Sequence, residues 1–338
     1  MVPISVILLL GAPGGAVRKV GKVDPTPLID SFSAGPSADR WAPELMVKGA
    51  ASVMPALQAM LPSIDPSWPV DWRKHHCILS MAAFVKSRRS QRQASGRSTN
   101  DGSVGSHRVK SKGSRSLPQV FHSHSAGKTA GMVYSQIVDE LGGRDAPLRM
   151  LEIGIGTNKT SAPSTMATWK GSNVNYLTGN FKKGKMGGAP EVRPYVPGAS
   201  LRAWRDYLTN ARVFGADVDP DILFEEERIR THVVDQLAPA TFNALHHDFG
   251  GAPYDLLIDD GLHAFAPNLN SLEFALRAVK RGGWIVVEDI SVSNMRELRV
   301  VDWMLTRRGD VDTCFVEQMG NNPIERPVAF LYVIHRRP

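Results

Sequence analysis

The chain has few cysteines and no long apolar run. Its 338 residues include only Cys77 and Cys314, which lie far apart and match no metal-ligand spacing. We therefore expect two reduced core cysteines and a cytoplasmic protein. The apolar run at residues 4–10 is too short to cross a bilayer and lacks the basic flank of a secretory signal, so no membrane partner is expected. We interpret it as a buried first strand or a poorly ordered start.

Acidic residues are in the minority, but the basic excess is local. The net charge is +7, yet between Lys86 and Arg115 nine basic residues accompany a single acid, Asp101. The rest of the chain is therefore close to neutral. A neutral body has no strong phosphate-binding surface, so nucleic acid is not an expected partner.

Composition divides the chain into three regions. Residues 1–85 mix proline-broken apolar pieces with one expected helix at 70–86, and their role is unknown. Residues 86–120 are Ser, Arg, Gly and Lys with almost no large apolar side chains, which predicts a disordered linker because too little surface can be buried. Residues 121–338 show a regular pattern and form the third region.

Apolar strand runs alternate with helical periods in this third region. We expect strands at 148–153, 213–217, 232–234, 255–259 and 284–288, with helices around them, among them 269–280. Continuous apolar strands separated by helices predict an α/β fold with a mostly parallel sheet covered on both faces. The last two strands, 313–317 and 328–334, leave no room for a helix. The sequence thus predicts a Rossmann-like sheet whose last strand is antiparallel.

The ends of the early strands suggest a nucleoside site. Glu152 precedes Gly154 and Gly156, and glycines there let backbone approach a ligand closely. Lys159 stands where a dinucleotide fingerprint has its third glycine, which disfavours NAD. Asp217 ends the next strand, where an acid can accept hydrogen bonds from ribose hydroxyls.

The following strand ends at Asp235 and Gln236. An amide or carboxylate at this position could reach an adenine edge, and it could equally cap the next helix. Both interpretations stay open at this stage.

Two later strands end in acids. One runs into Asp259-Asp260-Gly-Leu-His263 and the other into Glu288-Asp289. Open α/β sheets bind ligands at this carboxyl edge, and carboxylates from neighbouring tips could share a hard divalent cation. Successive strand residues point to opposite faces, so each acidic pair should divide into one site-facing and one supporting residue. Helix capping is the alternative.

These stretches resemble a known family. LEIGIG, RIRTHVVDQ, LLIDDGLH and GGWIVVEDI occur in the order found in the methyltransferase domain of macrocin- and mycinamicin-type sugar O-methyltransferases. The resemblance implies a class I S-adenosylmethionine-dependent methyltransferase domain at 121–338 that uses Mg²⁺. It also implies specific roles: metal ligands Asp260, Glu288 and Asp289, the base His263, and a cofactor site of Gly154, Gly156, Asp217, Asp235 and Gln236. We add Glu152 and Asp259, at the ends of their strands, to the expected cofactor site.

One departure concerns residues 157–197, an insertion where the family has a short loop. Such a loop beside an active site is typical of a lid, and its aromatic residues either contact the acceptor or pack the loop on itself. These are Trp169, Tyr176, Phe181 and Tyr195.

The expected function is Mg-assisted O-methylation of a small-molecule or sugar-containing acceptor. The alternatives are a cofactor-binding or interaction module without turnover, an RNA methyltransferase that uses the basic segment as an arm, and an NAD-dependent oxidoreductase. The sequence is also compatible with a homo-oligomer.

Overall fold

The computed structural model describes residues 77–94, 115–159, 166, 195–291, 294–306, 309–318 and 329–338. All of them belong to one compact unit, Arg73–Pro338. The N-terminal apolar run and most of the 157–197 insertion, with Trp169, Tyr176 and Phe181, lie outside the described residues. None of the helices in these ranges is both long and apolar enough to cross a membrane.

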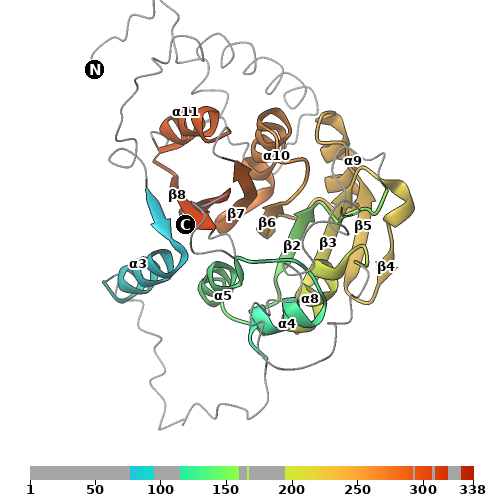
Figure 1. The fold of residues 1–338 in the computed structure, drawn as a ribbon, viewed down its shortest axis with the longest axis horizontal. Helices are drawn as coiled ribbons and strands as arrows, with labels where there is room; N and C mark the ends of the chain where they lie inside the picture. Colours follow the sequence, from blue (N-terminus) through green and yellow to red (C-terminus); the bar gives the residue numbers. More distant parts are fainter. Residues whose placement is uncertain are drawn as a thin grey trace, which may run out of the picture. The chain divides into compact units, whose positions relative to one another are not determined.

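The described strands form one mixed sheet in the order β1-β8-β9-β7-β6-β2-β3-β5-β4 (Figure 1). Neighbouring strands run parallel, except that β9 is antiparallel to β7 and β8, and β4 is antiparallel to β5. The strands are β1 Ile78–Ser80, β2 Arg149–Ile153, β3 Arg212–Asp217, β4 Glu225–Glu226, β5 Ile229–Val233, β6 Tyr254–Asp259, β7 Val279–Ser291, β8 Val311–Gln318 and β9 Ala329–Arg336.

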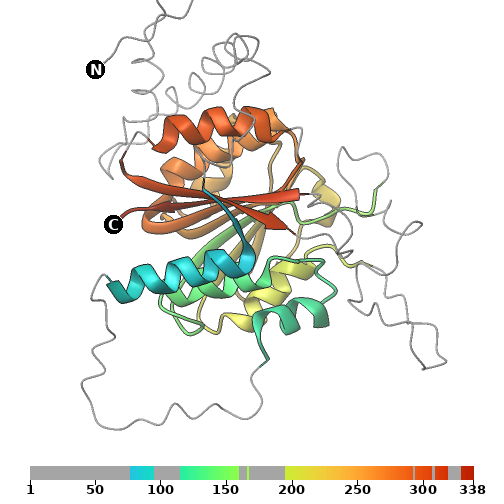
Figure 2. The ribbon, with the colours of Figure 1, turned by 60° about the vertical axis from the view of Figure 1, so that its left-hand side comes forward.

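Helices cover both faces of the sheet, as Figure 2 shows with the sheet nearly edge-on. One face carries α3 Met81–Ala94, α4 Leu117–Ser123, α5 Gly131–Glu140 and α8 Ala199–Tyr207, and the other carries α9 Ala240–Asp248, α10 Phe265–Ala278 and α11 Met295–Thr306. A short 3-10 turn, η4 Pro220–Ile222, follows β3. Because both faces are covered, β6 is buried along its whole length, which explains its continuous apolar sequence.

Three aromatic side chains join α4, α5 and α8 beneath the sheet. The ring centroids of Phe121 and Trp204 lie 5.0 Å apart, and those of Tyr134 and Trp204 lie 5.3 Å apart, both in edge-to-face arrangements. All three rings are fully buried. This packing fixes the polar ends of Tyr134 and Trp204, and both ends reach carboxylates at the strand tips.

The predicted fold is confirmed. The sheet is mostly parallel, it is covered on both faces, and its last strand β9 is antiparallel and pairs with β8 as expected. Element boundaries shift by a few residues; the helix expected at 269–280, for example, is α10, Phe265–Ala278.

The expected helix at 70–86 and the linker boundaries differ from the structure. Residues 78–80 form β1 instead, which pairs parallel with β8, and α3 then continues to Ala94. Residues 86–94, predicted as disordered linker, are therefore helical, and α4 begins within the predicted linker at Leu117. The reason is tertiary: one face of α3 packs on α5, and Phe84 is buried in an edge-to-face contact with Trp284.

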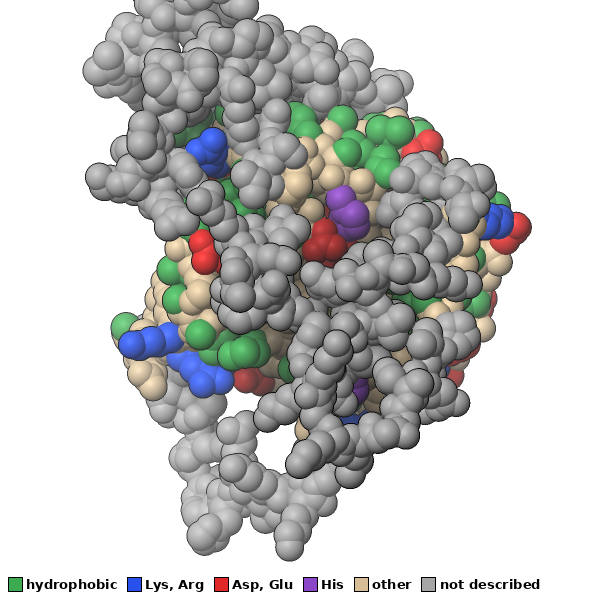
Figure 3. Space-filling model, in the orientation of Figure 1, with side chains coloured by type: hydrophobic (Ala, Val, Ile, Leu, Met, Phe, Trp, Pro, Cys, Tyr) green, Lys and Arg blue, Asp and Glu red, His purple; other side chains and the backbone are tan. Residues whose placement is uncertain are grey.

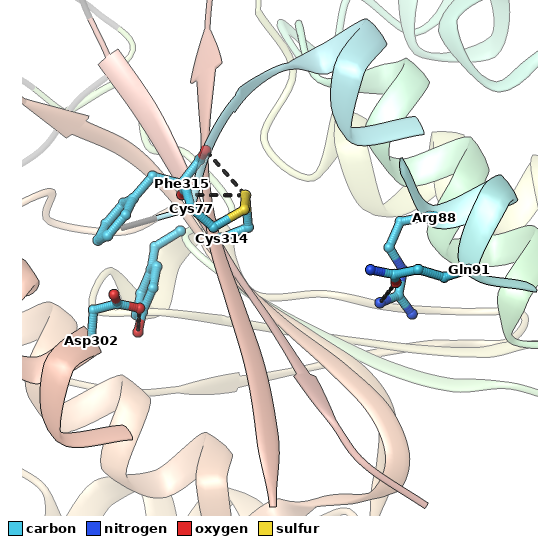
Figure 4. Close-up of a disulfide and its surroundings, with 7 residues drawn as sticks. Cys77, Arg88, Gln91, Asp302, Cys314 and Phe315 are labelled. Carbon is cyan, nitrogen blue, oxygen red and sulfur yellow. Dashed lines mark hydrogen bonds between the residues drawn. A yellow bond between two sulfur atoms is a disulfide. The ribbon is translucent and has the colours of Figure 1, made fainter. Parts of the chain in front are cut away.

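The prediction of reduced cysteines was wrong, because Cys77 and Cys314 form a disulfide (Figure 4). The pairing of β1 with β8 brings their Cα atoms to 4.7 Å, within the usual range for this bond. The sequence could not show this, since 237 residues separate the two positions.

Candidate active site at the carboxyl edge of the sheet

The acids predicted from the sequence meet because their strands are neighbours. β2 lies next to β6, with Glu152 opposite Ile258, and β6 lies next to β7, with Asp259 opposite Val287. This register places Asp260 beside Glu288, one residue past the paired positions. In β7 the pairing with β9 is irregular between Val287 and Ile290, which marks Glu288 and Asp289 as a bulge at the tip.

A lysine that the sequence analysis did not single out lies at the centre of these acids. Lys128, in the loop before α5, donates to Asp260 Oδ2 at 2.6 Å and to Glu288 Oε1 at 2.7 Å. Its ammonium also lies 3.2 Å from Glu152 Oε1. The Lys128 side chain is 3% exposed, so this one cation meets three carboxylates away from bulk water. We call these four residues the lysine cluster.

Tyr134 and α8 complete the lysine cluster. The Tyr134 hydroxyl donates to Glu288 Oε1, the same oxygen that accepts from Lys128. On the other side, Glu152 accepts from Ser200 Oγ at 2.6 Å and from Trp204 Nε1 at 3.1 Å. Glu152 and Glu288 thus have partners inside the protein for the oxygens that face the cluster.

Charge and burial act against each other in this cluster. Burial alone would lower the pKa of Lys128, but attraction by Asp260, Glu152 and Glu288 outweighs it and holds that pKa well above its usual value. Lys128 is therefore positively charged at neutral pH. Burial raises the pKa of Asp260 to about 6, although Lys128 and His263 both oppose this rise.

Asp260, His263 and Asp289 form a second group, whose ligand atoms all lie within 4.8 Å of one another. Asp289 is exposed, whereas the side chains of Asp260 and His263 are half-buried. His263 Nε2 lies 3.9 Å from Asp260 Oδ1, the oxygen that Lys128 does not occupy. In Figure 3 a histidine and an acidic side chain meet on the described surface. Two carboxylates and an imidazole are chemically suitable ligands for a divalent cation.

Backbone strain concentrates at the same place. Among the described non-glycine residues, four have positive φ, and His263 and Asp289 are two of them, both at 51°. Asn294 donates to the carbonyl of His263 at 2.9 Å and so fixes this conformation. Residues held in such conformations cluster at functional sites, because the surrounding structure must impose them.

Asp259 and Gln236 support the site from behind. Asp259 is fully buried and accepts from Gln236 Nε2 at 2.8 Å and from Asn268 Nδ2 at 2.9 Å. Gln236 Oε1 in turn accepts from the backbone of Leu262. These bonds connect the loop after β5 to the Asp-Asp-Gly-Leu-His loop. They also use the side-chain amide of Gln236 and the carboxylate of Asp259, the groups that were predicted to contact a cofactor.

The glycine turn and Asp217 form the other half of the edge. Asp217 Oδ2 accepts from the backbone N–H groups of Ile155 at 2.9 Å and of Gly156 at 3.1 Å, and Oδ1 accepts from Asp219. A carboxylate has about four lone-pair positions, so capacity remains for a ribose hydroxyl. Asp235 Oδ1 accepts from Leu237 N, which is a turn contact.

The turn is also tightly enclosed by protein. Gly154 has φ +96°, and a Cβ there would lie 2.0 Å from the carbonyl oxygen of Asp260. Over Gly156 lies Tyr195, whose hydroxyl donates to the carbonyl of Ile155 at 2.6 Å. Of the four aromatic residues singled out in the insertion, Tyr195 therefore packs on the turn.

Exposed apolar side chains follow the tips of β3 and β5. Val218, directly after β3, is 43% exposed, Val233 at the end of β5 is 41% exposed, and Leu237 in the loop after β5 is 59% exposed. Since β3 and β5 are neighbours, this edge offers apolar surface beside Asp217. A flat heteroaromatic ring is the kind of group that such a surface can cover.

Lys128 and Tyr134 were missed because nothing local marks them. Lys128 stands in a small-residue loop and meets Asp260 across 132 positions of the chain. A tyrosine on the apolar face of a helix usually belongs to the hydrophobic core. Tyr134 does so, and its hydroxyl also donates to Glu288.

The strand order and the helices on both faces define a Rossmann-like α/β domain, with acidic side chains gathered at the carboxyl edge of its sheet. No family model matches the chain. One stretch of 100 residues is 35% identical to the 8-demethyl-8-alpha-L-rhamnosyl tetracenomycin-C 2'-O-methyltransferase of Streptomyces olivaceus, covering 30% of this chain and 26% of that protein. Demethylmacrocin O-methyltransferase of Streptomyces fradiae is 34% identical over 97 residues, 29% of this chain and 24% of that protein.

The resemblance to sugar O-methyltransferases is thereby confirmed for part of the chain. The chain spans about a quarter of the length of the curated relatives it matches. Among solved structures, the MycE methyltransferase from the mycinamycin biosynthetic pathway aligns with 18% identity and a TM-score of 0.44, over 67% of this chain and 55% of that one.

Proposed function

We propose that this protein is an S-adenosylmethionine-dependent O-methyltransferase that acts, with help from Mg²⁺, on a hydroxyl of a small molecule or sugar-containing metabolite. One observation carries the proposal: Asp260, His263 and Asp289 converge beside the glycine turn at the carboxyl edge. The similarity of about 100 residues to curated sugar O-methyltransferases supports the same reaction.

The described residues fit the methyl donor. Asp217 would accept from ribose, the glycine turn would let the donor approach the backbone, and Val218 and Leu237 would cover adenine. When bound, S-adenosylmethionine would supply a methyl group on a positively charged sulfur.

The described residues also fit a hard divalent cation. Mg²⁺ is commonly held by one or two carboxylates while it keeps several waters, and Asp260 and Asp289 meet that description. When bound there, the ion would lower the pKa of a coordinated hydroxyl.

In this mechanism His263 is the base. His263 would take the hydroxyl proton as the acceptor oxygen receives the methyl group that the donor sulfur would give up. Asp260, 3.9 Å away, stabilises the imidazolium that results. The buried lysine cluster behind holds Asp260 in place, so the reacting groups need little reorganisation.

The first test separates binding from turnover. Calorimetry should show binding of S-adenosylhomocysteine but not of NAD. Turnover with S-adenosylmethionine and a panel of glycosides should fall on addition of EDTA and return with Mg²⁺. Replacement His263→Ala should lower turnover by about 10²–10⁴-fold, the usual contribution of a general base, and leave S-adenosylhomocysteine affinity within about twofold.

A matched variant is His247→Ala, because His247 is an exposed histidine on α9. It should change neither quantity. Equal loss of binding and turnover in His263→Ala would assign His263 a structural role. Turnover insensitive to both EDTA and His263→Ala would contradict the proposal and favour a module without this chemistry.

A further inference from the structure

We propose that Lys128 is an internal cation that withholds Glu288 from the divalent ion, so that Asp260 and Asp289 are the carboxylate ligands. Lys128 is in this view a positioning residue. The inference rests on the proposed function for its purpose, but it departs from the ligand set that the resemblance implies, which includes Glu288.

The two neighbouring acids of β7 have opposite surroundings. Glu288 is 3% exposed and its Oε1 accepts from both Lys128 and Tyr134. Asp289 is exposed and belongs to the group with Asp260 and His263. Among the described residues, Glu288 lies outside that group, and the two donors to its Oε1 hold its carboxylate on the side of the buried lysine cluster.

Lys128 also divides the oxygens of Asp260. Its ammonium lies 2.6 Å from Oδ2, whereas Oδ1 lies on the side of His263. One oxygen of Asp260 is thus bound to the internal cation and the other is left for an external one. A single carboxylate therefore connects the buried lysine cluster to the accessible group.

The negative charge of three buried acids explains why a lysine lies among them. Glu152, Asp260 and Glu288 come from three adjacent strands, and without Lys128 their buried charges would repel one another. A divalent ion would be the alternative way to neutralise them. Because Lys128 neutralises these buried acids, the divalent ion can bind nearer the surface, at the exposed Asp289, where an acceptor and water can reach it.

The experiment measures Mn²⁺ affinity of the full chain by electron paramagnetic resonance, without donor or acceptor. Replacement Glu288→Gln should leave Mn²⁺ affinity within about twofold, whereas the adjacent isosteric change Asp289→Asn should weaken it by about tenfold or more. Replacement Lys128→Met should tighten Mn²⁺ binding by about tenfold, because Glu288 and Asp260 Oδ2 become available. Adding Glu288→Gln to Lys128→Met should remove that gain.

Lys280→Met is the control, since Lys280 also pairs with an acid, Asp255, but does so at the other end of β6. It should leave Mn²⁺ affinity unchanged. The proposal is overturned if Glu288→Gln weakens Mn²⁺ binding as much as Asp289→Asn does, or if Mn²⁺ binds none of these proteins. If Lys128→Met does not fold, the proposal is still tested by comparing the Mn²⁺ affinities of Glu288→Gln and Asp289→Asn, because both variants keep Lys128.

This outcome is independent of the proposed reaction. Binding of S-adenosylhomocysteine and methyl transfer can succeed with Glu288 as a ligand, and the Mn²⁺ result can hold in a protein that transfers no methyl group.

Discussion

At the scale of single residues, Gly154 shows how close two strand tips approach. Because a Cβ at Gly154 would lie 2.0 Å from the carbonyl oxygen of Asp260, Gly154→Ala must displace the loop that carries Asp260. We expect it to lower the free energy of unfolding by about 1–3 kcal/mol and to weaken Mn²⁺ binding, measured by urea denaturation and resonance titration.

Gly143→Ala is the matched change, because Gly143 also has positive φ, +91°, but a Cβ there would meet nothing within 4 Å. This substitution should lower the free energy of unfolding by only about 1 kcal/mol, the cost of a Cβ at a residue with left-handed backbone conformation. Equal effects of the two substitutions on Mn²⁺ binding would show that the close approach at Gly154 does not position Asp260.

The same scale shows what the sequence reveals about the site. Asp260, His263 and Asp289 could be predicted to converge because each follows a recognisable strand, and parallel strands end at one edge. The roles of Asp259 and Gln236 could not be predicted, since their hydrogen bonds depend on side-chain packing within that edge. Lys128 could not be found at all, because its partners come from three separate strands.

At the scale of elements, β1 and α3 depend on a bond that joins distant parts of the chain. The disulfide between Cys77 and Cys314 connects the start of β1 to β8 (Figure 4). We expect reduction to lower the free energy of unfolding by about 2–4 kcal/mol, because the cross-link restricts the unfolded chain over 237 positions. Thermal unfolding with and without dithiothreitol measures the effect.

The double variant Cys77→Ser/Cys314→Ser should unfold at the temperature of the reduced protein and no longer respond to dithiothreitol. An oxidised wild type that is equally insensitive would contradict a stabilising role for the bond.

α3 also shows why composition misled the prediction of a linker. Its arginines have partners on α5: Arg88 with Glu140, Arg89 with Gln136, and Arg92 with the carbonyl of Asp139. Cations are favoured near a helix C-terminus, where α5 ends. The local sequence of α3 shows a basic stretch with small residues. The hydrogen-bond acceptors for its arginines lie on α5 and are brought near only by the tertiary fold. Part of the charge that suggested an RNA-binding arm is thereby neutralised within the fold.

At the scale of the whole molecule, buried histidines link stability to pH. Burial lowers the pKa of His246 and of His335, so the folded protein resists their protonation. The unfolded chain takes up these protons below about pH 6.5, and stability should therefore fall as pH falls through that value. His335 stacks on Trp284 with centroids 4.4 Å apart, which makes it the better position to test.

Urea denaturation of wild type and His335→Gln at pH 7.5 and 5.5 measures this effect. The raised pKa of Asp260 acts in the opposite sense, so the comparison between the two proteins is the informative quantity. The wild type should lose more stability than the variant between these pH values. An equal loss in both would mean that His335 titrates normally in the fold.

The two borders of the sheet are minimal. β1 has three residues and β4 has two, whereas the strands next to them have eight and five. A border strand presents unpaired backbone groups that can pair with a strand from another molecule. A very short border strand offers few such groups for hydrogen bonding. We therefore expect the two described border strands to be poor templates for edge-to-edge pairing with another molecule.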